Sequence, residues 1–134
     1  MALTLEIATP TRLVVADTGD EVVIPGIEGY FGVLAGHAPF LTTLGSGEVI
    51  YRLGQDEHHL AVAGGFAEVR NDKVIVLADS AERPGEIDRA RAERARERAE
   101  QRLAGRSQEE VDYHRAVCAL TRALTRLQVA GRGG

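Results

Sequence analysis

The sequence predicts a β + α fold with two unlike parts, an antiparallel β-sandwich or barrel over residues 1–84 and an antiparallel two-helix hairpin over residues 85–134. Three observations predict it. Short apolar runs with period two, separated by turn residues, fill the chain as far as Glu82. Helical periodicity begins after Pro84-Gly85. The net charge also changes sign, from −8 (12 acidic, 4 basic) over residues 1–82 to +4 (8 acidic, 12 basic) over residues 83–134.

The strands of the first part are indicated by alternation. The segment from Leu3 to Thr9 has an apolar side chain at every second position and ends at Pro10, which is typical of a half-buried strand. Similar short runs cover residues 13–15, 21–24, 32–34, 48–53, 59–62, 66–69 and 73–77. Turns rich in Gly, Asn and Asp separate the runs. Because no segment of helical length interrupts them, a parallel α/β sheet is disfavoured.

The first helix is predicted to begin at Asp88. Its carboxylate can accept hydrogen bonds from the free N–H groups of the first turn, and Ile87 can pack onto Ala92 as a hydrophobic staple. The helical pattern continues to about Ala104, and Gly105 is a natural stop.

A second helix follows after a connection of about three residues, which forces the two helices antiparallel. Residues 107–110 have the pattern of a capping box, and helical periodicity continues to about Ala130. The predicted seam sets Ala92, Ala95, Ala99 and Leu103 against Val117, Leu120, Leu124 and Leu127, with Tyr113 and Ala123 beside them. Since alanine buries little apolar surface, we expect this hairpin to be held weakly and to be able to open.

Arginines form one edge of each predicted helix. These edges comprise Arg91, Arg94, Arg98 and Arg102 on the first helix and Arg115, Arg122 and Arg126 on the second. Arg122 and Arg126 lie four residues apart, so their like charges repel each other. Neither has an acidic residue three or four positions away that would offset this repulsion. Two interpretations of the edges stay open: a solvated basic face, or a surface for a phosphate-bearing ligand, an acidic protein or a nucleic acid.

Bulk composition limits the class of protein. With 44% apolar residues and no Trp, a core must be built from Val, Leu, Ile and Ala. No apolar run approaches the roughly 20 residues of a membrane-spanning helix, and the start does not resemble a signal peptide. Cys118 is alone, so we expect no disulfide framework and a reducing compartment.

Neither a catalytic site nor a metal site is predicted. The glycines at 26, 29, 32 and 36 lack the spacing of a nucleotide-binding loop and are interpreted as turn and packing glycines. His58 and His59 should point to opposite faces of a strand as exposed residues, which makes them a poor metal pair. His37 is interpreted as a loop hydrogen-bonder, and Cys118 as structural, since no activating base is evident nearby.

The segment from Val22 to Leu44 carries a family resemblance. It reads VVIPGIEGYFGVLAGHAPFLTTL and closely resembles the signature stretch of the epsilon subunits of F-type ATP synthases. Residues 62–69 and 74–82 resemble that family's next two segments, and residues 119–127 its C-terminal helix. Ala35 replaces a common Pro, and Phe40 a common Leu or Met. The resemblance covers nearly the whole chain in the right order.

The resemblance implies a β-sandwich, usually of ten strands, followed by a two-helix domain, in a non-catalytic rotor subunit. The sandwich is expected to dock on the gamma subunit and the ring of c subunits, coupling proton flow to the catalytic head of alpha and beta subunits. Folded down, the helices permit ATP hydrolysis; extended along gamma, they meet the acidic C-terminal region of a beta subunit and inhibit it. The expected location is peripheral, at the cytoplasmic face of a bacterial plasma membrane.

Some bacterial members of this family also bind ATP through an Ile/Leu-Asp-x-x-Arg-Ala motif, which is intact here at residues 87–92. The resemblance implies that Arg91, Arg98, Arg122 and Arg126 contact the phosphates. It also implies that Glu82, Ile87, Asp88 and Ala92 hold or support the base end. ATP would then be a regulatory ligand and not a required cofactor.

The alternative from a different class is a nucleic-acid-binding module with a basic helical hairpin. It predicts an affinity that falls steeply with salt. The acidic sandwich and the few aromatic residues argue against it.

Overall fold

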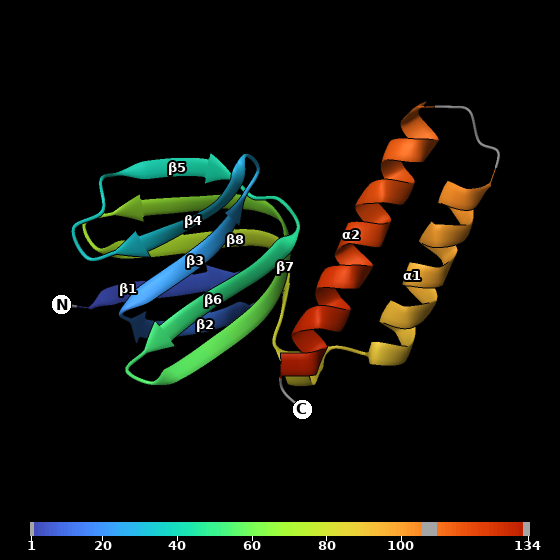
Figure 1. Cartoon of the computed structure of the whole chain (residues 1–134). Coiled ribbons are helices and arrows are strands. Elements are labelled where there is room, and N and C mark those ends of the chain that lie inside the picture. The colour runs from blue at the N-terminus through green and yellow to red at the C-terminus, as the bar shows by residue number, and fades with distance from the viewer. Residues whose placement is uncertain (1, 106–109, 133–134) are drawn as a thin grey trace. The chain divides into compact units, whose positions relative to one another are not determined.

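The computed structural model describes residues 2–105 and 110–132. The chain divides into two compact units, Met1–Glu82 and Arg83–Gly134. Their division lies beside Pro84 and Gly85, where the composition changes. In the described residues, the strands belong to the first unit and the two α-helices to the second, as Figure 1 shows.

The strands form one mixed sheet that folds into the expected β-sandwich. In order along the sheet they are β2 (Leu13–Gly19), β1 (Leu3–Ala8), β8 (Lys73–Glu82), β7 (Asp56–Arg70), β6 (Gly47–Leu53), β3 (Glu21–Gly26) and β4 (Gly29–Leu34), and β5 (Phe40–Thr43) pairs with β7. The described pairs are antiparallel, as expected, except that β1 lies parallel to β8. A parallel pair needs a long connection, and the intervening strands of the sandwich supply it here.

The described residues form eight strands, compared with the expected ten. β7 is one strand of 15 residues that runs through two of the expected short runs, 59–62 and 66–69. Conversely, alternation did not indicate β5, which is only four residues long and reads FLTT. Two short strands joined by a turn and one long strand with a kink can therefore have the same local pattern of apolar residues.

A kink at Gly64-Gly65 lets β7 continue while its partner changes. Before the kink β7 pairs with β6, and after it with β5, while β8 pairs along both parts. The φ angles are +66° at Gly64 and +102° at Gly65, values that residues other than glycine rarely adopt. A Cβ on Gly65 would also overlap the backbone oxygen of Leu77, and one on Gly64 would overlap the carboxylate of Asp79.

The core of the sandwich consists of the inward positions of the alternating runs. Tyr51 is its largest fully buried side chain, and the rest is aliphatic, as the composition predicts. Its fully buried members include Leu3, Leu5, Ile7, Val22, Ile24, Val49, Leu60, Val74 and Val76. All residues of this core cluster lie between Leu3 and Ala81, within the first unit.

Glu48 is a buried charged residue in this unit, only 5% exposed. Its Oε2 lies 3.0 Å from Nδ1 of His59, and Nε2 of His59 lies 3.0 Å from Oε1 of Glu57. The side chain of His59 is 13% exposed, so the expectation of an exposed histidine was wrong. His58 stacks on the ring of Tyr51, with centroids 4.7 Å apart. Alternation predicts on which face of a strand a side chain lies, but it does not predict how far that face is covered by the rest of the protein.

In the second unit, a short 3₁₀ turn, η1 (Pro84–Glu86), leads into α1 (Arg89–Ala104). The N-terminal cap is confirmed, because Oδ1 of Asp88 accepts a hydrogen bond from the backbone N–H of Arg91 at 3.0 Å. Ile87 is buried, as the staple prediction requires. Gly105 ends the helix with φ near −71°, so its role does not depend on the left-handed conformation.

α2 (Glu110–Arg132) lies antiparallel beside α1 (Figure 1). At one end of the pair, Nη2 of Arg89 donates a hydrogen bond to the backbone oxygen of Ala130 at 2.6 Å. This bond satisfies a carbonyl group at the C-terminal end of α2, where a cation is favourable. Residues 107–109 of the predicted capping box lie outside the described residues.

The contact between the helices is made largely of alanine. On α1, Ala92 and Ala99 are buried and Ala95 and Leu103 partly buried, as predicted. On α2 the prediction was wrong in part: Leu120 and Leu127 are partly buried, but Val117 and Leu124 are 36% and 48% exposed and Tyr113 is exposed. Among the residues of α2 whose burial is described, Ala116, Ala123, Val129 and Ala130 are buried. Small side chains occupy these buried positions because they let the two backbones approach closely.

Gly65→Ala is expected to destabilise the chain by at least about 3 kcal/mol, since the new Cβ meets fixed backbone at an unfavourable φ. The matched control is Gly54→Ala, at φ +62° with no atom near the added Cβ, which should cost only about 1 kcal/mol. Urea unfolding of the two variants measures the difference. Equal losses would contradict the role of the kink.

Candidate functional site

An exposed apolar row crosses the outer face of the sandwich. The register places Phe66 of β7 beside Leu77 of β8, Leu77 beside Ala8 of β1, and Ala8 beside Leu13 of β2. Phe66, Leu77 and Leu13 are 57%, 54% and 60% exposed. We call Phe66, Leu77, Ala8 and Leu13 the apolar row; its strands can be followed in Figure 1. Contiguous apolar side chains on a solvent-facing sheet indicate a surface for a partner.

The row is ordered by the same kink that shapes β7. Phe66 follows Gly64-Gly65 directly and faces outward, while its neighbour Ala67 is buried. On the β5 side, Thr43 lies opposite Phe66 and Leu41, 67% exposed, lies opposite Glu68. Glu6 and Lys73, which pair at 3.4 Å, lie on the same face of the neighbouring strands. The surface is thus apolar along one line and polar beside it, as interface centres and rims are.

The residues expected to bind a nucleotide occupy different structural positions. Glu82 ends β8 in the first unit, and the others belong to the second unit. The side chain of Asp88 is engaged in capping α1. Ala92 is fully buried in the helix seam, so it can support a ligand site only by packing.

The four arginines of that set differ in their local interactions. Arg91, Arg98 and Arg122 are exposed, and their side chains make no hydrogen bond or ion pair with another described residue. Arg126 is half-buried and does have a partner. By contrast, Arg96 on the other edge of α1 pairs with Glu93 and, at 2.7 Å, with Glu100. Two carboxylates of α1 are therefore paired within their own helix, whereas the side chains of Arg91 and Arg98 have no such partner among the described residues.

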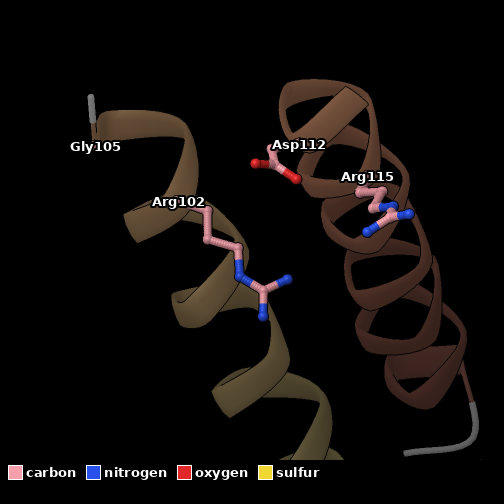
Figure 2. A pocket seen from close by; sticks show the side chains of 4 residues that line it. All are labelled: Arg102, Gly105, Asp112 and Arg115. Atoms are coloured by element: carbon pink, nitrogen blue, oxygen red, sulfur yellow. The ribbon is translucent and has the colours of Figure 1, made fainter. Parts of the chain in front are cut away.

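The basic edges of the two helices meet at the end of the hairpin where α1 ends and α2 begins. Arg102 and Arg115, one from each edge, line a single cavity of about 510 Å³ together with Gly105 and Asp112. Figure 2 shows Arg102 reaching from α1 towards α2 and Asp112 pointing from α2 towards α1. Because residues at i, i+4, i+7 and i+11 share a helix face, Arg98 and Arg122 lie on the continuation of these edges.

Two smaller expectations were tested by geometry. His37 is a loop hydrogen-bonder, as expected: its N–H donates to the Leu34 oxygen at 3.1 Å, and Nδ1 lies 2.6 Å from the Ala38 oxygen. Cys118, however, does have a neighbouring imidazole, since its Sγ lies 3.6 Å from Nε2 of His114. The spacing of four residues on a helix was the signal for this pair, and it was missed.

No three His, Cys, Asp or Glu side chains come together as a possible metal site in the part of the chain that the structure describes. Among the same residues, no helix is both long and apolar enough to span a membrane.

Comparison with known proteins agrees with this two-part structure. Residues 2–84 match the family described as "ATP synthase, Delta/Epsilon chain, beta-sandwich domain", and residues 86–131 match "ATP synthase, Delta/Epsilon chain, long alpha-helix domain". An ATP synthase epsilon chain from Nitratidesulfovibrio vulgaris is 52% identical, over 97% of this chain and 96% of its own length. One from Anaeromyxobacter sp. (strain K) is 47% identical over 98% and 100%.

Solved structures share the fold at lower identity. A chain of the Euglena gracilis mitochondrial ATP synthase has a TM-score of 0.80 at 24% identity, covering 96% of this chain and 81% of its own. A chain of the Tetrahymena thermophila enzyme has a TM-score of 0.63 at 14% identity, covering 97% of each chain.

The fold and the two family matches define the class, a delta/epsilon chain of an ATP synthase. Within that class, this chain belongs to the epsilon subunits of F-type ATP synthases, which are non-catalytic accessory subunits.

Proposed function

We propose that this subunit is a rotor component of the central stalk, which couples proton flow to ATP synthesis and restrains ATP hydrolysis. The β-sandwich docks on the gamma subunit and the c-ring, and the helical hairpin acts on the alpha and beta subunits of the catalytic head. The subunit is peripheral to the membrane, at the cytoplasmic face of a bacterial plasma membrane, and reaches it through these partners.

The apolar row carries the docking proposal. Each large side chain in it leaves more than half of its surface exposed, and burial of such a side chain contributes about 1.5–3 kcal/mol. Strong pairing of β7 with β8, and of β8 with β1, holds the row on rigid elements. A flat, preorganised apolar line suits a permanent partner, because little ordering is needed on binding.

The helical unit supports the regulatory part of the proposal. An alanine seam gives two well-formed helices with little apolar area between them, so their separation costs less than the opening of a leucine-rich hairpin. Arg91, Arg98 and Arg122 carry positive charge that no described side chain neutralises. An anion that contacts both helices stabilises the closed hairpin, and an acidic partner surface favours the open one.

ATP is the anion that we propose for the closed hairpin. Its phosphates would contact Arg91, Arg98, Arg122 and Arg126, and Glu82, Ile87, Asp88 and Ala92 would support the base end. The intact motif at residues 87–92 and the shared side of the basic edges support this assignment. ATP would act by mass action, so closure would follow its concentration relative to Kd.

The docking proposal predicts that Leu77→Ser weakens binding to purified gamma subunit by roughly tenfold or more, because the partner then loses an apolar contact. Leu34→Ser is the matched control, since Leu34 is equally exposed at 54% but lies on β4, outside the row. Surface plasmon resonance measures both affinities. Equal weakening by the two substitutions would contradict docking through the row.

The nucleotide proposal predicts that ATP raises the Tm of the unmutated chain and that Arg122→Ala or Arg126→Ala removes the rise. Arg94→Ala is the control, because Arg94 is an exposed arginine on the basic edge of α1 outside the proposed set. Differential scanning calorimetry with and without ATP measures the shift. No Tm change in the unmutated chain would refute ATP sensing.

Deletion of residues 86–134 should leave a folded sandwich that still binds gamma, since the core cluster and the apolar row lie within residues 3–81. Inhibition of hydrolysis in the reconstituted complex should fall at the same time. Circular dichroism, gamma binding and ATPase assays test the three expectations. Loss of gamma binding in a folded deletion variant would refute this division of labour.

A further inference from the structure

Three described residues that line the cavity at the end of the hairpin carry charges that do not neutralise one another. Among the described residues, Arg102, Asp112 and Arg115 form no ion pair or side-chain hydrogen bond, although all three line the same space of about 510 Å³. Arg102 and Arg115 thus line one cavity from opposite helices, and Figure 2 shows Arg102 reaching towards α2 and the carboxylate of Asp112 pointing towards α1. Like charges around one space favour an anion within it.

Asp112 restricts which anion fits. A carboxylate accepts hydrogen bonds but donates none, so it repels an oxyanion that carries no proton. Hydrogen phosphate keeps one P–OH group at neutral pH, which can donate to Asp112 while its other oxygens accept from Arg102 and Arg115. Sulfate has a similar size and charge but no such proton. The set of two guanidinium groups and one carboxylate therefore discriminates between the two anions.

We propose that Arg102, Asp112 and Arg115 form a binding site for hydrogen phosphate that is separate from the residues proposed for ATP. Arg98 lies about 6 Å along the α1 axis from Arg102, and Arg122 about 10 Å along the α2 axis from Arg115, at 1.5 Å per residue. A cavity of about 510 Å³ has room for the anion with bound water. The site does not depend on whether the chain binds ATP.

Occupation of this site has a consequence for the hairpin. The anion contacts α1 through Arg102 and α2 through Arg115, so it binds the closed pair of helices and loses one contact when they separate. Free phosphate would therefore stabilise the closed hairpin according to its concentration. Phosphate is the co-substrate of ATP synthesis, and the site would make hairpin closure responsive to its supply.

The test is an NMR titration of the full chain with inorganic phosphate or sulfate at neutral pH and constant ionic strength, followed at the backbone amide of Gly105. We expect saturable shifts with phosphate and at least about fivefold weaker binding of sulfate. Arg102→Gln or Arg115→Gln should weaken phosphate binding about fivefold or more, and the control Arg94→Gln less than about twofold. Asp112→Asn should abolish the preference for phosphate over sulfate.

Equal affinities for phosphate and sulfate in the unmutated chain would overturn the proposal, as would an Asp112→Asn variant that retains the preference. The Arg122→Ala variant distinguishes two possible binding positions for the phosphate, the cavity at the end of the hairpin and the residues proposed for the nucleotide. It should keep phosphate binding at Gly105, and loss of that binding would assign the phosphate to the proposed nucleotide residues. Thermal melts of each variant verify folding, and Arg115→Lys, which retains charge without the planar fork, should bind with intermediate affinity.

Discussion

The close alanine contact between α1 and α2 is the constraint on which the behaviour of the helical unit depends. Ala92 and Ala99 meet a row of α2 that includes Ala116 and Ala123, so the backbones approach closely while little apolar surface is buried. Because the helices have strong intrinsic propensity, they depend less on this contact for their helical structure than weaker helix formers would. The same contact brings Arg102 and Arg115, one from each basic edge, to a single cavity, where the proposed anion would contact both helices.

The sandwich follows the opposite design. Apart from Tyr51 its core is aliphatic and buried, and the kink at Gly64-Gly65 lets β7 pair with β6 along one part and with β5 along the other. The rigid sheet that results presents its apolar row without the need for a conformational change. The proposed docking surface and the proposed opening of the hairpin thus depend on different kinds of contact.

Much of this organisation could be predicted from local sequence. The cap at Asp88, the α1 side of the seam and most strands follow from residue type and period. The family resemblance, which rests on the segment from Val22 to Leu44, was confirmed by matches over nearly the whole chain. The α2 side of the seam was predicted less well, because the prediction favoured its larger and more hydrophobic residues over the alanines. Hydrophobicity alone takes no account of how closely two backbones can approach.

By itself, then, the sequence determined the two units, their charges, their periods and the family, since these depend on neighbouring residues. Only the tertiary structure decided which strands pair, that β1 lies parallel to β8, and that Phe66, Leu77, Ala8 and Leu13 form a continuous row. It also decided that Glu48 and His59 are paired and covered, and that Arg102, Asp112 and Arg115 face one cavity. The physical reason is that a one-residue change of register, or a small rotation of a helix, would leave every local pattern intact and yet move each of these groups apart.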